Sequence, residues 1–201
     1  MTSLSDARAL GGVGSILVLL TVVPSVGWIL GIAGLVMTLI SIKYISDSVR
    51  DNRIYSNMLV SVVLAIGAIA VGTVAVIGTV FRVLGMGSFV GSEFIPAANV
   101  TTGDWVGLGV AIAAGLVAVW ALLVASAVFL RRSYNSIAAR VNVNLFSTAG
   151  LLYLIGAATA IIGIGFFLIL VAQILLAVSF FSIKEGGVTQ AVQAAGVPAS
   201  A

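Results

Sequence analysis

The sequence predicts an all-α fold, an integral membrane bundle of about six transmembrane helices, and three observations lead to this class. The chain of 201 residues is 61% hydrophobic and only 7% charged, and its mean hydropathy is +1.28. Soluble domains carry about 25% charged residues, so this chain has too few charges to cover a surface that faces water. Several apolar runs also reach the ~18 residues that a transmembrane helix needs.

Two residue types that serve many catalytic and metal sites are missing from the sequence. The chain has no cysteine and no histidine, which excludes disulfides, thiolate or imidazole metal sites and any mechanism that needs imidazole. We therefore expect no metal and no cofactor. The net charge of +3 comes from a few basic residues near the ends of the predicted helices, so we expect no binding to nucleic acid.

All 201 residues are predicted to form a single transmembrane domain. Its start, with Arg8 before an apolar run, could also belong to a signal peptide. Pro24 and Gly27 instead predict a turn into a second apolar run, which Trp28 opens and Lys43 closes at the interface. The predicted spans are residues 7–23, 27–45, 58–84, 105–130, 145–162 and 166–183, with an outer loop at 85–104 and a C-terminal tail at 185–201.

The first and last hairpins of the chain are similar. Residues 10–43 and 145–184 each consist of two apolar runs joined by a short turn, and both end on the tripeptide Ser-Ile-Lys, at 41–43 and 182–184. Both hairpins are predicted to enter the membrane from the same side. An internal duplication would therefore be parallel, with its axis along the membrane normal.

The middle of the chain holds two connections of different character. The short charged segment at 46–57 is predicted to be a solvated loop on the inner side of the membrane. The segment at 85–104 is rich in glycine and only moderately polar, and we expect it to lie on the outer membrane surface or to enter the membrane in part. Within it, Asn99-Val100-Thr101 fits the N-glycosylation pattern, so Asn99 is a candidate modification site.

The distribution of positive charge predicts the orientation of the chain. With both termini in the cytoplasm and six helices alternating in direction, eight of the nine Lys and Arg residues fall on the inner side, as the positive-inside rule favours. Arg82, near the outer end of the third span, is the exception, and we expect its side chain to reach the lipid head groups. The chain is thus predicted to be a multi-pass protein of the cell membrane.

Small residues at helical spacing are the clearest pattern within the predicted spans. They allow helix backbones to approach closely in a membrane, where no hydrophobic effect holds helices together. We expect them to pack helices within one chain, and the alternative is a face for self-association. The candidate packing residues are Gly27, Gly31, Gly103, Gly107, Ala111, Gly115, Gly156 and Ala160.

Polar chemistry inside the predicted spans is scarce. Gln173 is the most polar side chain at mid-span, and we expect it to form a structural hydrogen bond across helices. Other hydroxyl groups are expected to bond to carbonyls of their own helices; they belong to Thr21, Thr38, Ser61, Thr73, Ser126 and Thr159. No Asp or Glu lies beside a Ser or Lys at mid-depth, so no catalytic residue is assigned and we expect no enzyme.

Several of these segments resemble an archaeal family of multi-pass membrane proteins that is catalogued only as a domain of unknown function, DUF996. The likeness is strongest in the closing hairpin, in AGLLYLIGA at 149–157, IGIGF at 162–166 and FFSI at 180–183. It extends to LGGVG at 10–14 and PSVG at 24–27. The resemblance covers nearly the whole chain and implies a helical bundle in an archaeal cell membrane. It implies no activity, ligand or catalytic residue.

Two functions from different classes fit this sequence. The first is a non-enzymatic accessory or structural subunit that contacts membrane lipids and associates with other membrane proteins or with itself, because small-residue faces are plentiful and polar groups in the spans are few. The alternative is a channel or carrier for a small neutral or lipidic solute, with glycines of the third and fourth spans lining its path.

Overall fold

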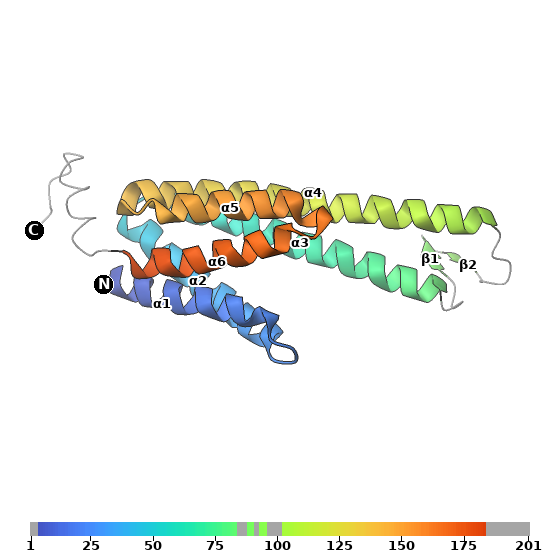
Figure 1. Ribbon diagram of the computed structural model, residues 1–201, viewed down its shortest axis with the longest axis horizontal. Helices are drawn as coiled ribbons and strands as arrows, with labels where there is room; N and C mark the ends of the chain where they lie inside the picture. The colour runs from blue at the N-terminus through green and yellow to red at the C-terminus, as the bar shows by residue number, and fades with distance from the viewer. Residues whose placement is uncertain (1–3, 84–87, 91–92, 96–101, 184–201) are drawn as a thin grey trace, which may run out of the picture.

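The computed structural model describes residues 4–83, 88–90, 93–95 and 102–183 of the chain (Figure 1). Two single-turn 3-10 helices, η1 (Leu20–Val22) and η2 (Ala160–Ile162), extend α1 and α5, and the strands β1 (Ser88–Val90) and β2 (Glu93–Ile95) lie between α3 and α4. The all-α bundle predicted from the sequence is confirmed. The helices are α1 (Leu4–Leu19), α2 (Gly27–Ser48), α3 (Asn52–Val83), α4 (Thr102–Val141), α5 (Leu145–Thr159) and α6 (Gly165–Phe181).

Most of the described helices are suited to a bilayer. Five helical segments are long and apolar enough to cross a membrane, and α6 is a shorter apolar helix of 17 residues. Large apolar side chains are exposed along these helices, among them Val74 at 73% and Ile69 at 68%. Such a surface is normal in hydrocarbon and unfavourable in water. The described segments therefore indicate a membrane protein.

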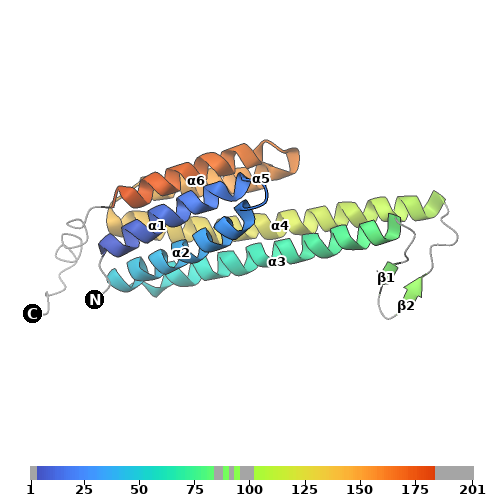
Figure 2. The same ribbon diagram turned by 90° about the horizontal axis from the view of Figure 1, so that it is seen from below.

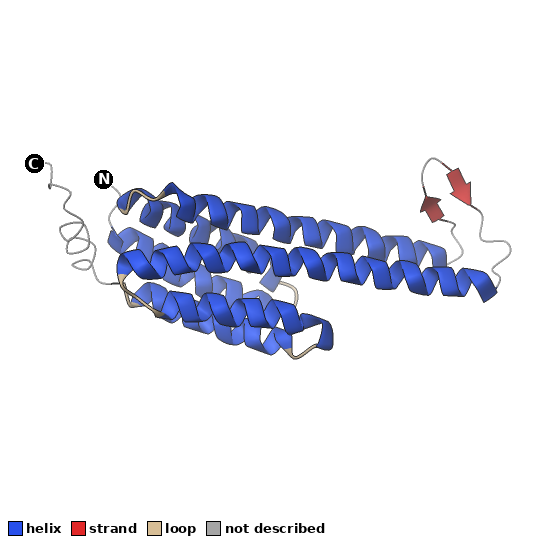
Figure 3. Cartoon of the chain, turned by 90° about the horizontal axis from the view of Figure 1, so that it is seen from above, coloured by secondary structure: helices blue, strands red, loops and turns tan. Residues whose placement is uncertain are grey.

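One long helix pair carries two short hairpins. The helices α3 and α4 contain 32 and 40 residues, or about 48 and 60 Å at 1.5 Å per residue. The α1–α2 and α5–α6 hairpins pack along one half of this pair, and their turns end well before it does (Figures 1 and 2). Both hairpins have their open ends beside the described ends of the chain, and the strands lie at the opposite end (Figure 3).

The two short hairpins turn in a similar way. In each, a 3-10 turn ends the first helix and the second helix begins at a glycine, Gly27 or Gly165. The first turn passes through Ser25 at φ 71°, and the second passes through Gly163 at φ 82°. Positive φ suits glycine and is uncommon for serine. The similarity of the hairpins that the sequence suggests is thus visible in their backbone.

The buried core lies where all six helices meet, beside the open ends of the hairpins. Phe146 and Phe180 are fully buried there, with their rings edge to face at 5.1 Å, and Tyr134 lies 6.2 Å from Phe146. Ala7 of α1 and apolar residues from the rest of the bundle complete the cluster. They are Ile42, Ile45, Ile54, Met58, Leu130, Ile137, Ala138, Val141, Ala149, Leu176 and Ile183.

The first polar connection is shorter than predicted, because α3 begins at Asn52 and the segment predicted as loop at 46–57 is largely helical. Asp51 stands at the N-cap of α3, where its Oδ1 accepts the N–H of Arg53 at 3.2 Å. The next turn places Ile54 and Met58, four residues apart, into the core. A cap and a buried apolar face together explain why the helix starts early. α4 continues beyond residue 130 to Val141, and this added part also buries apolar residues in the core, among them Ile137 and Val141.

The outer loop also contains more structure than expected. β1 and β2 pair antiparallel, with Ser88 opposite Ile95 and Val90 opposite Glu93. The sequence predicts a loop at 85–104, so this short hairpin and the start of α4 at Thr102 correct that prediction. Alternation of apolar and polar residues over three positions is too short a signal to predict a strand. Asn99 lies outside the described residues.

Candidate functional site

Most of the basic residues gather at one end of the bundle, which we call the basic end. It holds the open ends of both short hairpins, the α2–α3 turn and the α4–α5 turn (Figure 1). These two turns pass through Arg50 and Asn142, each at φ 53°. The basic side chains at this end are Arg8, Lys43, Arg50, Arg53, Arg131, Arg132 and Arg140.

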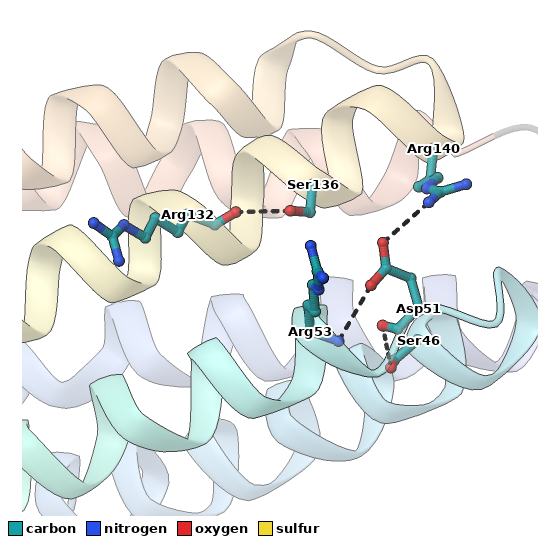
Figure 4. A network of polar contacts seen from close by, with 6 residues as sticks. All are labelled: Ser46, Asp51, Arg53, Arg132, Ser136 and Arg140. Carbon is teal, nitrogen blue, oxygen red and sulfur yellow. Dashed lines mark hydrogen bonds and ion pairs between the residues drawn. The ribbon is translucent and has the colours of Figure 1, made fainter.

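Asp51 organises the polar contacts of the basic end (Figure 4). Its carboxylate caps α3 and also forms an ion pair with Arg140, whose Nη2 lies 3.2 Å from Oδ2. Ser46 donates to the backbone carbonyl of Asp51 at 2.8 Å. The carboxylate thus connects the α2–α3 turn to the last turn of α4. The Arg140 side chain is 53% exposed, and such a pair typically contributes 0–1 kcal/mol, so its role is to orient the turn.

Two other arginines of this end are free to meet anions. Arg53 and Arg132 are exposed, and in the part of the chain that the structure describes neither forms an ion pair with a carboxylate. Arg132 lies over the ring of Phe129, with its Cζ 5.5 Å from the centroid. Basic residues at the cytoplasmic edge of a membrane helix attract anionic head groups. The basic end therefore presents exposed positive charge at Arg53 and Arg132.

Buried hydroxyl groups join the helices to one another. Ser126 donates to the carbonyl of Ser61 at 2.8 Å, and their two Oγ atoms lie 3.0 Å apart. Ser133 donates to the carbonyl of Ile54 at 2.8 Å, and Ser41 donates to that of Ala7 at 2.6 Å. These bonds set the register of α3 against α4 and of α1 against α2.

The prediction that hydroxyl groups bond within their own helices is confirmed for the threonines and wrong for two serines. Thr21, Thr38, Thr73 and Thr159 each donate to a carbonyl three or four residues before them. Ser61 and Ser126 bond to each other instead, because both lie on the facing sides of α3 and α4. Gln173 is half-buried on α6, and the described residues provide no hydrogen bond to its side chain.

Four of the candidate packing residues lie in the seams of the short hairpins. A Cβ on Gly31 would lie 2.8 Å from Thr21 Oγ1, and one on Gly156 would lie 2.9 Å from the carbonyl oxygen of Gly165. Gly27 faces the Thr21 carbonyl, and Ala160 adjoins Gly165. In both hairpins the small residues let the two helices approach close to the turn.

The candidate residues on α4 are placed differently. A Cβ on Gly115 would make an ordinary contact of 3.5 Å with Ala75, whereas one on Gly107 would have nothing within 4 Å. The side-chain surroundings of Gly103 and Ala111 lie outside the described part of the chain. The regular spacing of four residues therefore does not put this whole stripe into a helix seam within the chain.

Glycines that were not singled out from the sequence are also closely packed. A Cβ on Gly34 would lie 2.5 Å from the Gly14 carbonyl oxygen, and one on Gly150 would lie 3.2 Å from the Cα of Arg131. Gly11 and Gly12 face the rings of Phe180 and Phe181. The sequence contained a signal for close packing at 11–14, since three glycines in four residues are unusual in a helix. Its packing partners could not be read without the fold.

An open apolar groove of about 410 Å³ lies on the α3–α4 pair. We call it the Gly72 groove. The hydroxyl of Thr73, the polar group in its lining, already donates to the Ile69 carbonyl at 2.8 Å. Such a surface suits a hydrocarbon chain and provides little for a polar solute. The lining residues are Ala68, Ile69, Gly72, Thr73, Val76, Ile77, Val119 and Leu123.

Comparison with known proteins supplies relatives without a known activity. A family described as "Protein of unknown function (DUF996)" matches residues 30–174. The uncharacterized protein MJ1644 of Methanocaldococcus jannaschii is 35% identical to this chain over 182 residues, which is 90% of this chain and 94% of that protein. No solved structure matches.

Proposed function

We propose that this chain, which belongs to the DUF996 family of proteins of unknown function, is a non-enzymatic protein of the cell membrane. We further propose that it works by associating with other membrane proteins. In this role it serves as an accessory or structural subunit. Its partners are membrane lipids and other membrane-protein subunits or a second copy of itself, and nucleic acid is not among them.

The observation that supports this proposal most directly is an unpartnered small-residue face on α3. Gly67 and Gly78 are eleven residues apart, which is about three turns of a helix, so they share one face with Val74 between them. A Cβ on either glycine would have no atom within 4 Å, and Val74 is 73% exposed. Small residues on an outward face allow a second membrane helix to approach.

The polar groups of the spans support a packing role in place of chemistry. The hydroxyls of Ser61, Ser126 and Ser133 are occupied by bonds between helices. Asp51 is engaged as a helix cap and as the partner of Arg140. Side chains that are fully used by the fold are poor candidates for acid–base or nucleophilic roles.

The alternative is a carrier for a small neutral or lipidic solute, and the Gly72 groove favours the lipidic form. The groove is open along the α3–α4 pair, and Gly72 is part of its lining. Gly72 is one of the third-span glycines that a solute path was expected to use. Beside it, however, α3 and α4 meet directly at Ser61 and Ser126 and at Ala75 and Gly115. These contacts leave a lipidic solute on the outer surface of the pair and give a hydrated path through it little room.

The test is the native mass of the protein extracted from its own membranes in mild detergent, with mass spectrometry of the proteins that travel with it. We expect a particle larger than the monomer, with companions or further copies in fixed ratio. Gly78→Leu should weaken that association, whereas Ala139→Leu, on the exposed face of α4 at the basic end, should not. A monomer without companions would overturn the proposal, and flux assays in liposomes would then test the carrier.

A further inference from the structure

We propose that only the α3–α4 pair crosses the bilayer completely, and that the α1–α2 and α5–α6 hairpins enter from the basic end and turn within the hydrocarbon. The molecule is then a wedge, with six helices in one leaflet and two in the other. We further propose that it favours curved membrane in which the leaflet at the basic end is the convex one.

The charges on the long pair set the position of the bilayer. Between Arg53 and Arg82 on α3, and between Arg131 and Asp104 on α4, the sequence contains no Lys, Arg, Asp or Glu. Each interval is about 41–44 Å along the helix axis at 1.5 Å per residue. A hydrocarbon core of about 30 Å, crossed at the usual tilt of about 20°, fits within this length.

Contacts between α4 and α5 show how far along α4 the α5–α6 turn lies. Gly150 of α5 lies against the backbone of Arg131, and Trp120 Nε1 donates to the Ala158 carbonyl at 3.0 Å. Because α4 and α5 are antiparallel, Ala158, eight residues beyond Gly150, is about 12 Å further from the basic end than Arg131 is. The turn at Ile162 adds about 6 Å, so it lies about 21 Å short of the level of Trp105.

The α1–α2 turn lies at a similar depth. Gly11 packs against Phe180, whose ring contacts Phe146, and Phe146 in turn lies beside Tyr134 of α4. From the level of Tyr134, α1 and η1 continue for about 17 Å to Val22. Figures 1 and 2 show both turns beside the middle of the long pair, which continues alone toward the strands.

A bilayer centred on the short hairpins would be unfavourable for two reasons. It would draw Arg131 and the exposed Arg132 about 8 Å into the hydrocarbon, since Gly150 is five residues beyond the start of α5. It would also push the far part of the long pair into water, where Val106 and Val110, at 66% and 63% exposure, would be hydrated. Placing the bilayer on the long pair avoids both costs.

The two turns are themselves suited to hydrocarbon. Neither contains a charged residue, and Val22, Ile162 and Phe167 are exposed at 66–69%. Short turns also satisfy much of their own backbone: Gly27 N–H donates to the Val23 carbonyl at 2.9 Å, and Gly163 N–H donates to that of Ala160 at 3.0 Å. Paired amides are what a chain needs where no water is present.

The depth of the turns can be measured with single cysteines, because the chain has none of its own. Val22→Cys and Ile162→Cys report the two turns, while Ala139→Cys and Thr102→Cys mark the basic end and the far end of α4. In proteoliposomes, a membrane-impermeant maleimide should label the two end markers from opposite sides. It should label neither turn until detergent is added, and a fluorophore at each turn should be quenched most by doxyl groups at mid-chain.

Labelling of the turns from the side that exposes Thr102→Cys would show complete spans and overturn the proposal. Circular dichroism and gel filtration of each variant separate this result from misfolding. The curvature step has its own test: orientation is compared in small sonicated and large extruded vesicles. The ratio of molecules with Ala139→Cys outside to molecules with it inside should be several-fold higher in the small vesicles, and equal ratios would refute the wedge.

Discussion

The contact between Gly14 and Gly34 provides the sharpest test of the packing described here. A Cβ on Gly34 would lie 2.5 Å from the Gly14 carbonyl oxygen and 2.7 Å from the Val18 nitrogen. Ordinary C···O contacts begin near 3.3 Å, so α1 and α2 would have to separate by about 0.8 Å. Both neighbouring atoms belong to the backbone and cannot rotate away. Overpacking of this kind costs about 1–3 kcal/mol, and we expect Gly34→Ala to lie at the upper end.

Gly67→Ala is the matched control, because its Cβ would have no atom within 4 Å. Replacing a helical glycine by alanine adds about 1 kcal/mol of helix propensity at either site. The net expectation is a loss of about 2 kcal/mol for Gly34→Ala, roughly a 30-fold change in the unfolding equilibrium, and a gain of about 1 kcal/mol for Gly67→Ala. Reversible unfolding in mixed micelles with increasing dodecyl sulfate measures both. Equal stability of the two variants would refute the close approach of α1 and α2.

Three further predictions follow from other contacts and use the same unfolding assay. Phe180→Ala removes a fully buried ring that packs edge to face on Phe146 and should cost about 3–5 kcal/mol; a loss under 1 kcal/mol would mean that the core is not packed as described. Ser126→Ala breaks the bond between α3 and α4 and should cost about 0.6–1.7 kcal/mol, the range seen within membranes. Asp51→Asn keeps a cap on α3 and loses only the ion pair with Arg140, so Asp51→Ala should be about 1 kcal/mol less stable than Asp51→Asn; identical stabilities would contradict the capping role.

The proposals for association and for partial spans concern different surfaces of the molecule. Association is argued from the outward face of α3 that carries Gly67 and Gly78. The wedge is argued from the depth of the turns at Val22 and Ile162 and needs no partner protein. A monomer whose turns lie within the hydrocarbon would therefore refute association and support the wedge. A complex whose turns reach water on the far side would support association and refute the wedge.

Composition and local pattern were sufficient to predict much of this protein. Apolar runs long enough for a membrane predict the helices, since length and hydropathy are properties of each segment alone. The turn at Pro24 and Gly27 was predicted because these residues act on the backbone locally. Helix ends were predicted less well: α3 starts at Asn52 because Asp51 caps it and Ile54 is buried, and burial depends on neighbours that the segment does not contain.

Contacts between segments were decided only by the tertiary structure. The spacing of Gly107 resembles that of Gly31, yet Gly31 meets Thr21 and Gly107 meets nothing within 4 Å. Ser61 and Ser126 are 65 residues apart in the chain, and nothing near either one indicates their bond. Hydropathy likewise predicts that a segment enters a membrane without saying how deep its turn lies. That depth depends on the register of α5 against α4, which is set by packing at Gly150 and Trp120 and not by the composition of either helix.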